Sequence, residues 1–197
     1  MVCYRFAAYS TPLRTVAAWQ SARFSRADEA EPTQYLSLHP LGPLAELMRN
    51  ADLRRGEQVA AVSTRTWALE VSFDGLPEIT FQSAREFGIS AEELVADDHG
   101  ACQSLAARIR TLFPGVVVPS AALPGTRNVV LFGPRVAAPY LTRPVAAIDV
   151  PASITADHGR PPMSLRSLVR FRGDSHAALA AWRAGSTFAF AEPDWSL

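Results

Sequence analysis

The sequence of 197 residues predicts a single α+β (mixed α/β) domain in which central mixed β-sheets are flanked by helices. Apolar and polar residues alternate over 67–73, which is the pattern of a half-buried strand. Two apolar runs, at 116–118 and 128–132, stop at Pro or Gly and indicate buried strands. A helical stripe over 101–113 adds the α component. No repeat, low-complexity tract or linker divides the chain, so residues 1–197 are expected to form one domain.

The first part of the chain is expected to alternate strands with loops. Residues 2–9 are typical of a strand, and a second short strand is predicted at 22–25. Residues 26–33 are polar and acidic and contain Pro32, which indicates a loop. Residues 34–38 are strand-like and lead into the first predicted helix.

That helix is predicted to begin at Pro43 and to end near Gly56. Proline suits a first helical position because its missing N–H would have no partner there, and glycine is favoured just after a last turn. Leucine and methionine recur at i, i+3 and i+4 and give the helix one apolar face. Glu46 lies off that face, about 200° around the helix from Leu44. Taken alone, Glu46 is explained by its favourable interaction with the positive end of the helix dipole.

The middle of the chain is expected to contain a strand over 58–73 and two helices. Ser90 and Glu93 have the spacing of a capping box, which marks the start of the first of these helices. The second helix is predicted over 101–113, with Leu112 in its apolar stripe and a Pro-Gly pair after its end.

The last part of the chain is expected to surround an irregular, proline-rich segment at 135–164. The core is assigned to about residues 2–134, and a strand–helix–strand extension to about 165–190. The helix of this extension is expected over 176–184. Strands are predicted at 116–120, 128–132, 145–150, 165–171 and 186–190.

Composition excludes several classes of function. Lysine and arginine together number 19, as do aspartate and glutamate, so the net charge is zero and no direct nucleic-acid binding is expected. The chain has no apolar run of membrane-spanning length and no signal-peptide pattern, so no membrane association is expected. Cys3 and Cys102 do not form a disulfide framework, and a cytoplasmic location is expected.

The common signatures of cofactor and metal chemistry are absent. The sequence has neither the G-x-G-x-x-G turn of dinucleotide-binding folds nor a P-loop. It also lacks the G-x-S-x-G nucleophile elbow, and no pattern indicates a Ser-His-Asp triad. The four histidines have no metal-ligand spacing, so they are interpreted as surface or capping residues and no metal site is predicted.

Several short motifs follow one another along the chain. They are Tyr4-Arg5, Ala22-Arg23-Phe24, Tyr35-Leu36-Ser37 followed by Glu46, Val118-Pro119-Ser120-Ala121-Ala122 and Arg127-Asn128-Val129-Val130-Leu131-Phe132. In this order they resemble the RES domain, the toxin half of a bacterial toxin–antitoxin pair, named for its Arg, Glu and Ser motifs. The resemblance covers most of the chain. It departs from the family at Ser21-Ala22, where members often have glycine, and in the acidic loop that follows Arg23.

The resemblance implies a fold related to ADP-ribosyltransferases, with NAD+ as the substrate. Cleavage of the nicotinamide–ribose bond is expected, by hydrolysis or by phosphorolysis with inorganic phosphate as co-substrate, without a resident cofactor. An Xre-type antitoxin with a helix-turn-helix is the implied partner, and a toxin homodimer within that complex is also implied. Two alternatives remain open: a protein ADP-ribosyltransferase toxin, and a non-catalytic module that binds NAD or a partner, suggested by the altered loop at 25–33.

The resemblance also assigns roles to residues. Cleavage passes through an oxocarbenium-like species, whose positive charge the Glu46 carboxylate would stabilise beside the ribose. The Tyr35 ring would stack on nicotinamide, and the Arg23 guanidinium would bind the pyrophosphate. The implied catalytic residues are therefore Arg23, Tyr35 and Glu46. The implied substrate-binding residues are Arg23, Tyr35, Ser37, Ser120 and Asn128, with Ser120 and Asn128 as hydrogen-bonding groups for phosphate.

Each of these residues also has an ordinary structural explanation. Arg23 can neutralise the carboxylates in the loop at 28–31. Tyr35 can be a core aromatic residue, and Ser120, which follows a proline, can belong to a turn. Asn128 at the start of a strand is more often structural. The order of the motifs favours the site interpretation of Arg23.

Overall fold

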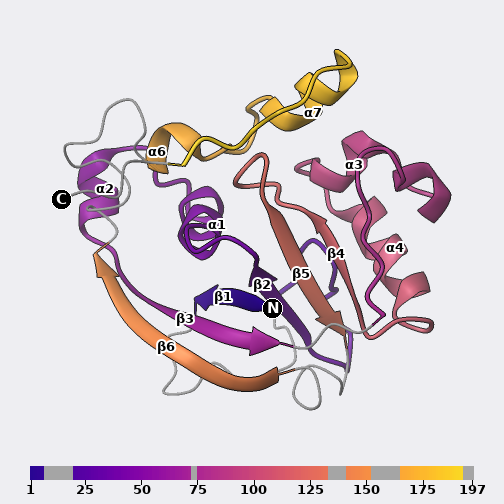
Figure 1. Cartoon of the computed structure of the whole chain (residues 1–197), viewed down its shortest axis with the longest axis horizontal. Helices are drawn as coiled ribbons and strands as arrows, with labels where there is room; N and C mark the ends of the chain where they lie inside the picture. The colour runs from indigo at the N-terminus through magenta and orange to yellow at the C-terminus, as the bar shows by residue number, and fades with distance from the viewer. Residues whose placement is uncertain (7–19, 72–74, 133–140, 152–164, 193–197) are drawn as a thin grey trace.

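A six-stranded sheet forms the frame of the protein (Figure 1). The computed structural model describes residues 1–6, 20–71, 75–132, 141–151 and 165–192. The strand order is β4-β5-β2-β1-β3-β6, and every pair of neighbours is antiparallel. With the helices below, this confirms the predicted α+β class. The strands are β1 (Val2–Phe6), β2 (Thr33–Ser37), β3 (Ser63–Val71), β4 (Gly115–Pro119), β5 (Arg127–Phe132) and β6 (Leu141–Pro151).

The register of the central strands brings predicted site residues onto one face of the sheet. Ser37 of β2 is paired with Asn128 of β5 and with Tyr4 of β1. Because side chains alternate along a strand, Tyr35 shares the face of Ser37, while Leu36 points to the opposite face. Three of the predicted site residues, Tyr35, Ser37 and Asn128, therefore occupy neighbouring positions on the same face.

Helices cover this face over the central strands and at the β4 edge of the sheet (Figure 1). Helix α1 contacts β1 and β2, while α3 contacts β4 and α4 packs against α3. The predicted capping box is confirmed at the start of α3: the Glu93 N–H donates to Ser90 Oγ at 3.2 Å, and the Ser90 N–H donates to the Glu93 carboxylate at 2.8 Å. The helices are α1 (Gly42–Asn50), α2 (Gly56–Ala60), the 3-10 helix η1 (Ala84–Phe87), α3 (Ala91–Val95), α4 (Gly100–Ile109), α6 (Leu165–Leu168) and α7 (Ala177–Arg183).

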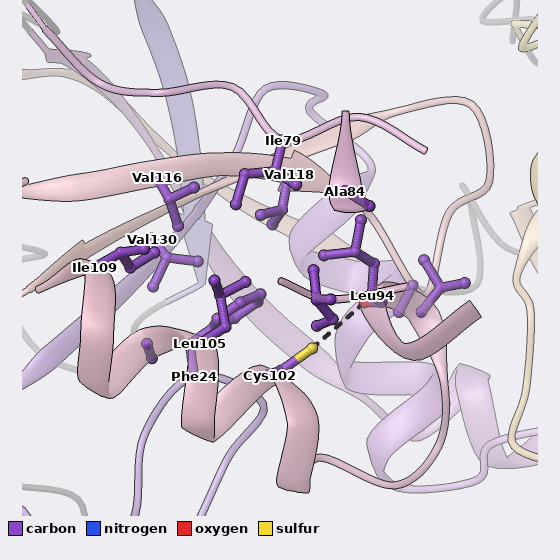
Figure 2. Close-up of a cluster of buried hydrophobic side chains, with 14 of the residues drawn as sticks. Phe24, Ile79, Ala84, Leu94, Cys102, Leu105, Ile109, Val116, Val118 and Val130 are labelled. Carbon is purple, nitrogen blue, oxygen red and sulfur yellow. Dashed lines mark hydrogen bonds between the residues drawn. The ribbon is translucent and has the colours of Figure 1, made fainter. Parts of the chain in front are cut away.

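Three clusters of buried apolar side chains hold these layers together. One lies between the sheet and helices α3 and α4, where Phe24, Leu94 and Leu105 are packed around Cys102 (Figure 2). A second joins α1 to the C-terminal segment that begins with Leu165. The third fills the opposite face of the sheet. Each fully buried leucine or phenylalanine contributes about 1.5–3 kcal/mol relative to an exposed one.

The first predicted helix is shorter than expected, and the prediction that it ends near Gly56 was wrong. Helix α1 ends at Asn50, and Asp52 takes the left-handed conformation with φ of 50°. Aspartate tolerates this region better than most residues because its short side chain bonds locally. Gly56 instead begins the next helix, α2, so residues 58–60 are helical and not part of the predicted strand.

The prediction of a short strand at 22–25 was wrong. The Ala22 N–H donates to the Ser25 carbonyl at 2.9 Å, so these residues close a tight turn with one isolated bridge. Helix α4 ends at Ile109, and Leu112 is 74% exposed, outside the apolar stripe expected of it. The other part of the N-terminal strand prediction, residues 7–9, lies outside the described residues.

Predictions for the C-terminal part need the largest correction. The strand expected at 145–150 is part of the longer β6, so that stretch of the proline-rich segment is regular. Residues 165–168 form helix α6 where a strand was predicted, and 186–190 form no strand. Both apolar stretches pack on other elements, α1 among them, and short apolar runs do not by themselves distinguish strand from helix. The predicted helix is confirmed as α7, with His176 as its N-cap.

In the described part of the chain, no helix combines the length and apolarity that crossing a lipid bilayer requires.

Candidate functional site

Glu46 and Asn128 form the centre of the candidate site. Glu46 lies at the middle of α1, beyond its first turn, so the expected interaction with the positive end of the helix dipole does not explain it. Asn128 lies near the start of β5, 82 positions away along the chain. The Asn128 side-chain amide donates from Nδ2 to Glu46 Oε1 at 3.0 Å. The other amide atom, Asn128 Oδ1, is buried and has no hydrogen-bond partner among the described residues. The pair thus fixes the carboxylate, and Asn128 Oδ1 remains a buried acceptor without a partner among the described residues.

The turn between β2 and α1 determines where Glu46 stands. Ser37 is buried, and its Oγ accepts the His39 N–H at 3.2 Å. The turn packs so closely that a Cβ on Gly42 would lie 1.8 Å from Ser37 Oγ. Glycine at 42 and a small hydroxyl side chain at 37 therefore set the first turn of α1. The predicted role of Ser37 in substrate binding stays a prediction.

Tyr35 connects the sheet to the tight turn at 22–25. Its hydroxyl accepts the Phe24 N–H at 3.0 Å and shares a hydrogen bond with Ser25 Oγ at 3.1 Å. Burial raises the pKa of the Tyr35 phenol, so this side chain stays neutral at physiological pH. The ring packs against the apolar cluster of α3 and α4 while remaining partly exposed. Tyr35 therefore positions the turn that carries Arg23.

Arg23 faces the region between α3 and α4. Its guanidinium donates to the Leu94 carbonyl at 3.3 Å. The structural alternative of an ion pair with the loop carboxylate Glu29 is not observed, because Glu29 pairs with Arg110 at 2.7 Å. Among the described residues Arg23 makes no ion pair and no direct contact with Glu46. The structure thus joins Tyr35 to the turn of Arg23, and separately joins Glu46 to Asn128.

Three arginine charges act on His99. Burial, together with the charges of Arg23, Arg172 and Arg49, lowers the pKa of His99 to about 4, while Asp98 acts in the opposite direction. His99 is the N-cap residue of α4, and its ring is neutral at physiological pH. Sequence reasoning missed this combined effect, because the arginines come from three separate segments of the chain.

Ser120 is completely buried in the turn that follows β4. Its Oγ accepts the Leu123 N–H at 3.1 Å, and its carbonyl accepts a hydrogen bond from His176 Nε2 at 3.0 Å. His176 Nδ1 accepts the Leu179 N–H at 3.1 Å, so the ring proton is on Nε2. The predicted phosphate contact of Ser120 stays a prediction, since its hydroxyl is engaged within the turn.

A polar cluster that the sequence did not indicate lies at the end of α1. Arg49 is 2% exposed, forms an ion pair with Asp97 and donates to the Arg170 carbonyl at 2.9 Å. Arg170 also pairs with Asp97, at 3.1 Å. The only sequence signal for such a cluster is an arginine in the last turn of an amphipathic helix. This signal is weak, because the sequence does not show which partner the arginine meets. Among the described residues, no group of three or more His, Cys, Asp or Glu side chains is arranged to hold a metal ion.

The fold and these contacts define a class: an α+β domain in which a carboxylate on the helix after β2 is held by an amide on β5. The family model for the RES domain matches residues 3–153, and the chain belongs to that family. A chain of the crystal structure of the M. tuberculosis MbcT-MbcA toxin-antitoxin complex has a similar fold, with a TM-score of 0.62 and 21% sequence identity. That match covers 77% of this chain and 85% of the other. No curated protein matches the sequence.

Proposed function

We propose that this protein is the toxin of a toxin–antitoxin pair and that it cleaves NAD+ at the nicotinamide–ribose bond. The observation that carries the proposal is the Glu46 carboxylate held by Asn128 on one face of the sheet, in a chain of the RES domain family. A carboxylate that is held in place can stabilise the positive charge of the oxocarbenium-like transition state through which a glycosidic bond is cleaved.

The proposed chemistry is a substitution at the ribose carbon that bears nicotinamide. The carbon–nitrogen bond breaks, its electron pair leaves with nicotinamide, and an oxocarbenium-like ribose remains. Glu46 stabilises the positive charge that develops on the ribose. Water then adds and loses a proton to give ADP-ribose, or inorganic phosphate adds to give ADP-ribose phosphorylated at that carbon.

The other residues are proposed to bind and orient the substrate. Arg23 suits a pyrophosphate, because a guanidinium can bind phosphate oxygens in a bidentate manner. The partly exposed ring of Tyr35 offers a surface on which nicotinamide stacks. Asn128 accepts a substrate hydroxyl or amide at Oδ1, and Ser37 and Ser120 support the turns around this group.

The proposed partner is an antitoxin of the Xre type with a helix-turn-helix. A similar fold occurs in the MbcT-MbcA toxin-antitoxin complex, and this supports a protein antitoxin as the partner here. We also propose that the toxin works in the cytoplasm, where NAD+ is available, and that it forms a homodimer within the complex.

The test is nicotinamide release from NAD+ by the purified chain, with and without inorganic phosphate, beside Glu46→Gln. The matched control is Glu57→Gln, which removes an exposed carboxylate on the neighbouring helix α2. We expect release by the parent and by Glu57→Gln, and none by Glu46→Gln. Dependence on phosphate identifies phosphorolysis.

Two other results would redirect the proposal. Labelling of a protein by ADP-ribose in place of free product identifies a protein ADP-ribosyltransferase. Folded protein that binds NAD+ without releasing nicotinamide is the non-catalytic binding module.

A further inference from the structure

One carboxylate, Asp97, contacts both helix α1 and the C-terminal segment. Arg49, in the last turn of α1, lies one helical turn beyond Glu46 and is almost fully buried. Its guanidinium pairs with Asp97 and donates to the Arg170 carbonyl at 2.9 Å. Asp97 thus contacts the helix that carries the proposed catalytic carboxylate.

The other side of Asp97 is occupied by the C-terminal segment. The Gly173 N–H donates to Asp97 Oδ2 at 2.7 Å, and the Arg170 guanidinium lies 3.1 Å from Oδ1. Burial opposes ionisation, but the Gly173 N–H and the Arg49 guanidinium together hold the pKa of Asp97 below its usual range. The guanidinium groups of Arg49 and Arg170 therefore share a single carboxylate.

Apolar side chains also join α1 to the C-terminal segment. Leu165, Val169 and Phe171 share a buried cluster with Leu44 and Met48 of α1. Figure 1 shows α6 beside α1, on the side away from α4. The family match ends at residue 153, so the segment that supports α1 comes from outside the matched region.

We propose that Asp97 is a positioning residue: it clamps α1 to the segment 165–173 and so holds Glu46 in register with Asn128. This inference rests on the proposed function of Glu46. Without the Asp97 charge, two like charges at the end of α1 repel each other, and the side chains of Arg49 and Arg170 must find other partners. The helix then shifts or loosens at the turn next to Glu46.

The test compares Asp97→Asn with Asp97→Glu, using the full chain. Asp97 lies at the outer end of the cluster, with 34% of its side chain exposed, so the near-isosteric asparagine leaves no cavity. We expect Asp97→Asn to lower kcat for nicotinamide release by about 10- to 100-fold with KM changed less than about twofold, because small misplacements of a reacting group have effects of this size. Asp97→Glu restores the charge and recovers most of kcat.

The matched control is Glu92→Gln, which removes a different ion pair between segments. Glu92 of α3 pairs with Arg183 of α7 at 2.6 Å on the surface and does not touch α1. We expect its kcat to equal that of the parent. A kcat of Asp97→Asn within twofold of the parent, or equal losses in Asp97→Asn and Glu92→Gln, overturns the inference.

A second measurement separates this inference from the proposed reaction. Amide hydrogen exchange is compared in the parent and in Asp97→Asn for residues 44–50 of α1 and 102–109 of α4. We expect faster exchange in α1 only. If the parent releases no nicotinamide, the proposed function fails, but the exchange measurement still tests whether Asp97 holds α1 in place. Unchanged exchange in α1 overturns the inference. Should Asp97→Asn not fold, Arg49→Lys is measured in the same way, because lysine keeps the charge but replaces the two guanidinium nitrogens that contact Arg170 and Asp97 separately with a single ammonium nitrogen.

Discussion

At the scale of single residues, the side chain of Asn128 makes the most informative contact in the candidate site. A side-chain amide that donates to a carboxylate and keeps a buried, unpartnered oxygen is unusual, because buried polar atoms normally have partners. The contact indicates that Asn128 orients Glu46, and its predicted contact with phosphate stays a prediction.

Replacement of Asn128 by aspartate tests this role. The change preserves shape but places a second carboxylate within hydrogen-bonding distance of Glu46, so the bond is lost and the two groups repel. We expect nicotinamide release to fall by at least about 100-fold, which corresponds to the roughly 3 kcal/mol typical of one lost charge-assisted contact. Asn50→Asp, exposed at the end of α1, is the matched control. Activity of Asn128→Asp equal to that of the control would contradict the orienting role.

His176 supplies a pH dependence of stability. Burial lowers the pKa of the folded imidazole, and the neutral ring bonds both Ser120 and Leu179. In the unfolded chain the ring binds its proton near pH 6.5. Stability from this group is therefore complete above about pH 6.5 and is lost as the pH falls toward the folded value. The lowered pKa of His99, about 4, acts in the same direction.

Thermal unfolding at pH 7.5 and pH 5 measures this effect. We expect a lower Tm at pH 5, and a smaller difference in His176→Asn, because asparagine can cap α7 but does not titrate. His39→Asn is the comparison, since His39 is bonded to an exposed carboxylate near the end of the described chain. An equal pH difference in the parent and His176→Asn would exclude a contribution from His176.

At the scale of elements, the turn between β2 and α1 is the most tightly constrained connection near the site. Ser37 is fixed by its pairing with Asn128 across the sheet, and Gly42 approaches it without room for a Cβ. The two residues set the path from the strand of Tyr35 to the helix of Glu46. Because the constraint is a contact between two residues five positions apart, it depends on both Ser37 and Gly42.

Gly42→Ala is expected to destabilise the protein by about 1–3 kcal/mol, the usual cost of overpacking a filled site. The new Cβ would lie 1.8 Å from Ser37 Oγ, so the turn or the helix has to move. Gly100→Ala is the control, because at the start of α4 the nearest atom to its new Cβ is 3.5 Å away. Denaturant unfolding compares the two. Addition of Ser37→Gly should recover stability in Gly42→Ala, and failure to do so would place the strain elsewhere.

At the scale of the whole molecule, the C-terminal segment completes the domain. It supplies apolar side chains to the cluster around α1, Arg170 to the Asp97 cluster and His176 to the turn of Ser120. These contacts reach the helix that carries Glu46 and the turn that contains Ser120. The segment is thus part of the same folded unit as the region that the RES domain model matches.

The biological outcome of the proposed reaction also belongs to this scale. Expression of the chain alone in a bacterial host should arrest growth and reduce cellular NAD+, because the proposed reaction consumes NAD+. Glu46→Gln, expressed to the same level, should be tolerated, and co-expression of the antitoxin should restore growth. Growth arrest that persists in Glu46→Gln with normal NAD+ would point to a different toxic activity.

The local elements near the site could largely be predicted from sequence. Strand alternation, the Ser90 capping box and the apolar runs of β4 and β5 act over neighbouring residues, so their signals are present in the sequence itself. The α+β class and family membership followed from the same short patterns in order. The helix ends at Asn50 and Ile109 and the helical form of 165–168 were missed, because contacts with distant segments decide them.

The sequence by itself determined the type of fold, the family and the residue types that the site contains. Only the tertiary structure decided which of them meet: Glu46 with Asn128, Tyr35 with the turn of Arg23, and Arg49 with Asp97 and Arg170. The physical reason is the distance along the sequence over which each effect acts. Propensity and periodicity act within a few residues, whereas each of these pairings depends on strand register and helix packing that bring together groups 11 to 121 positions apart.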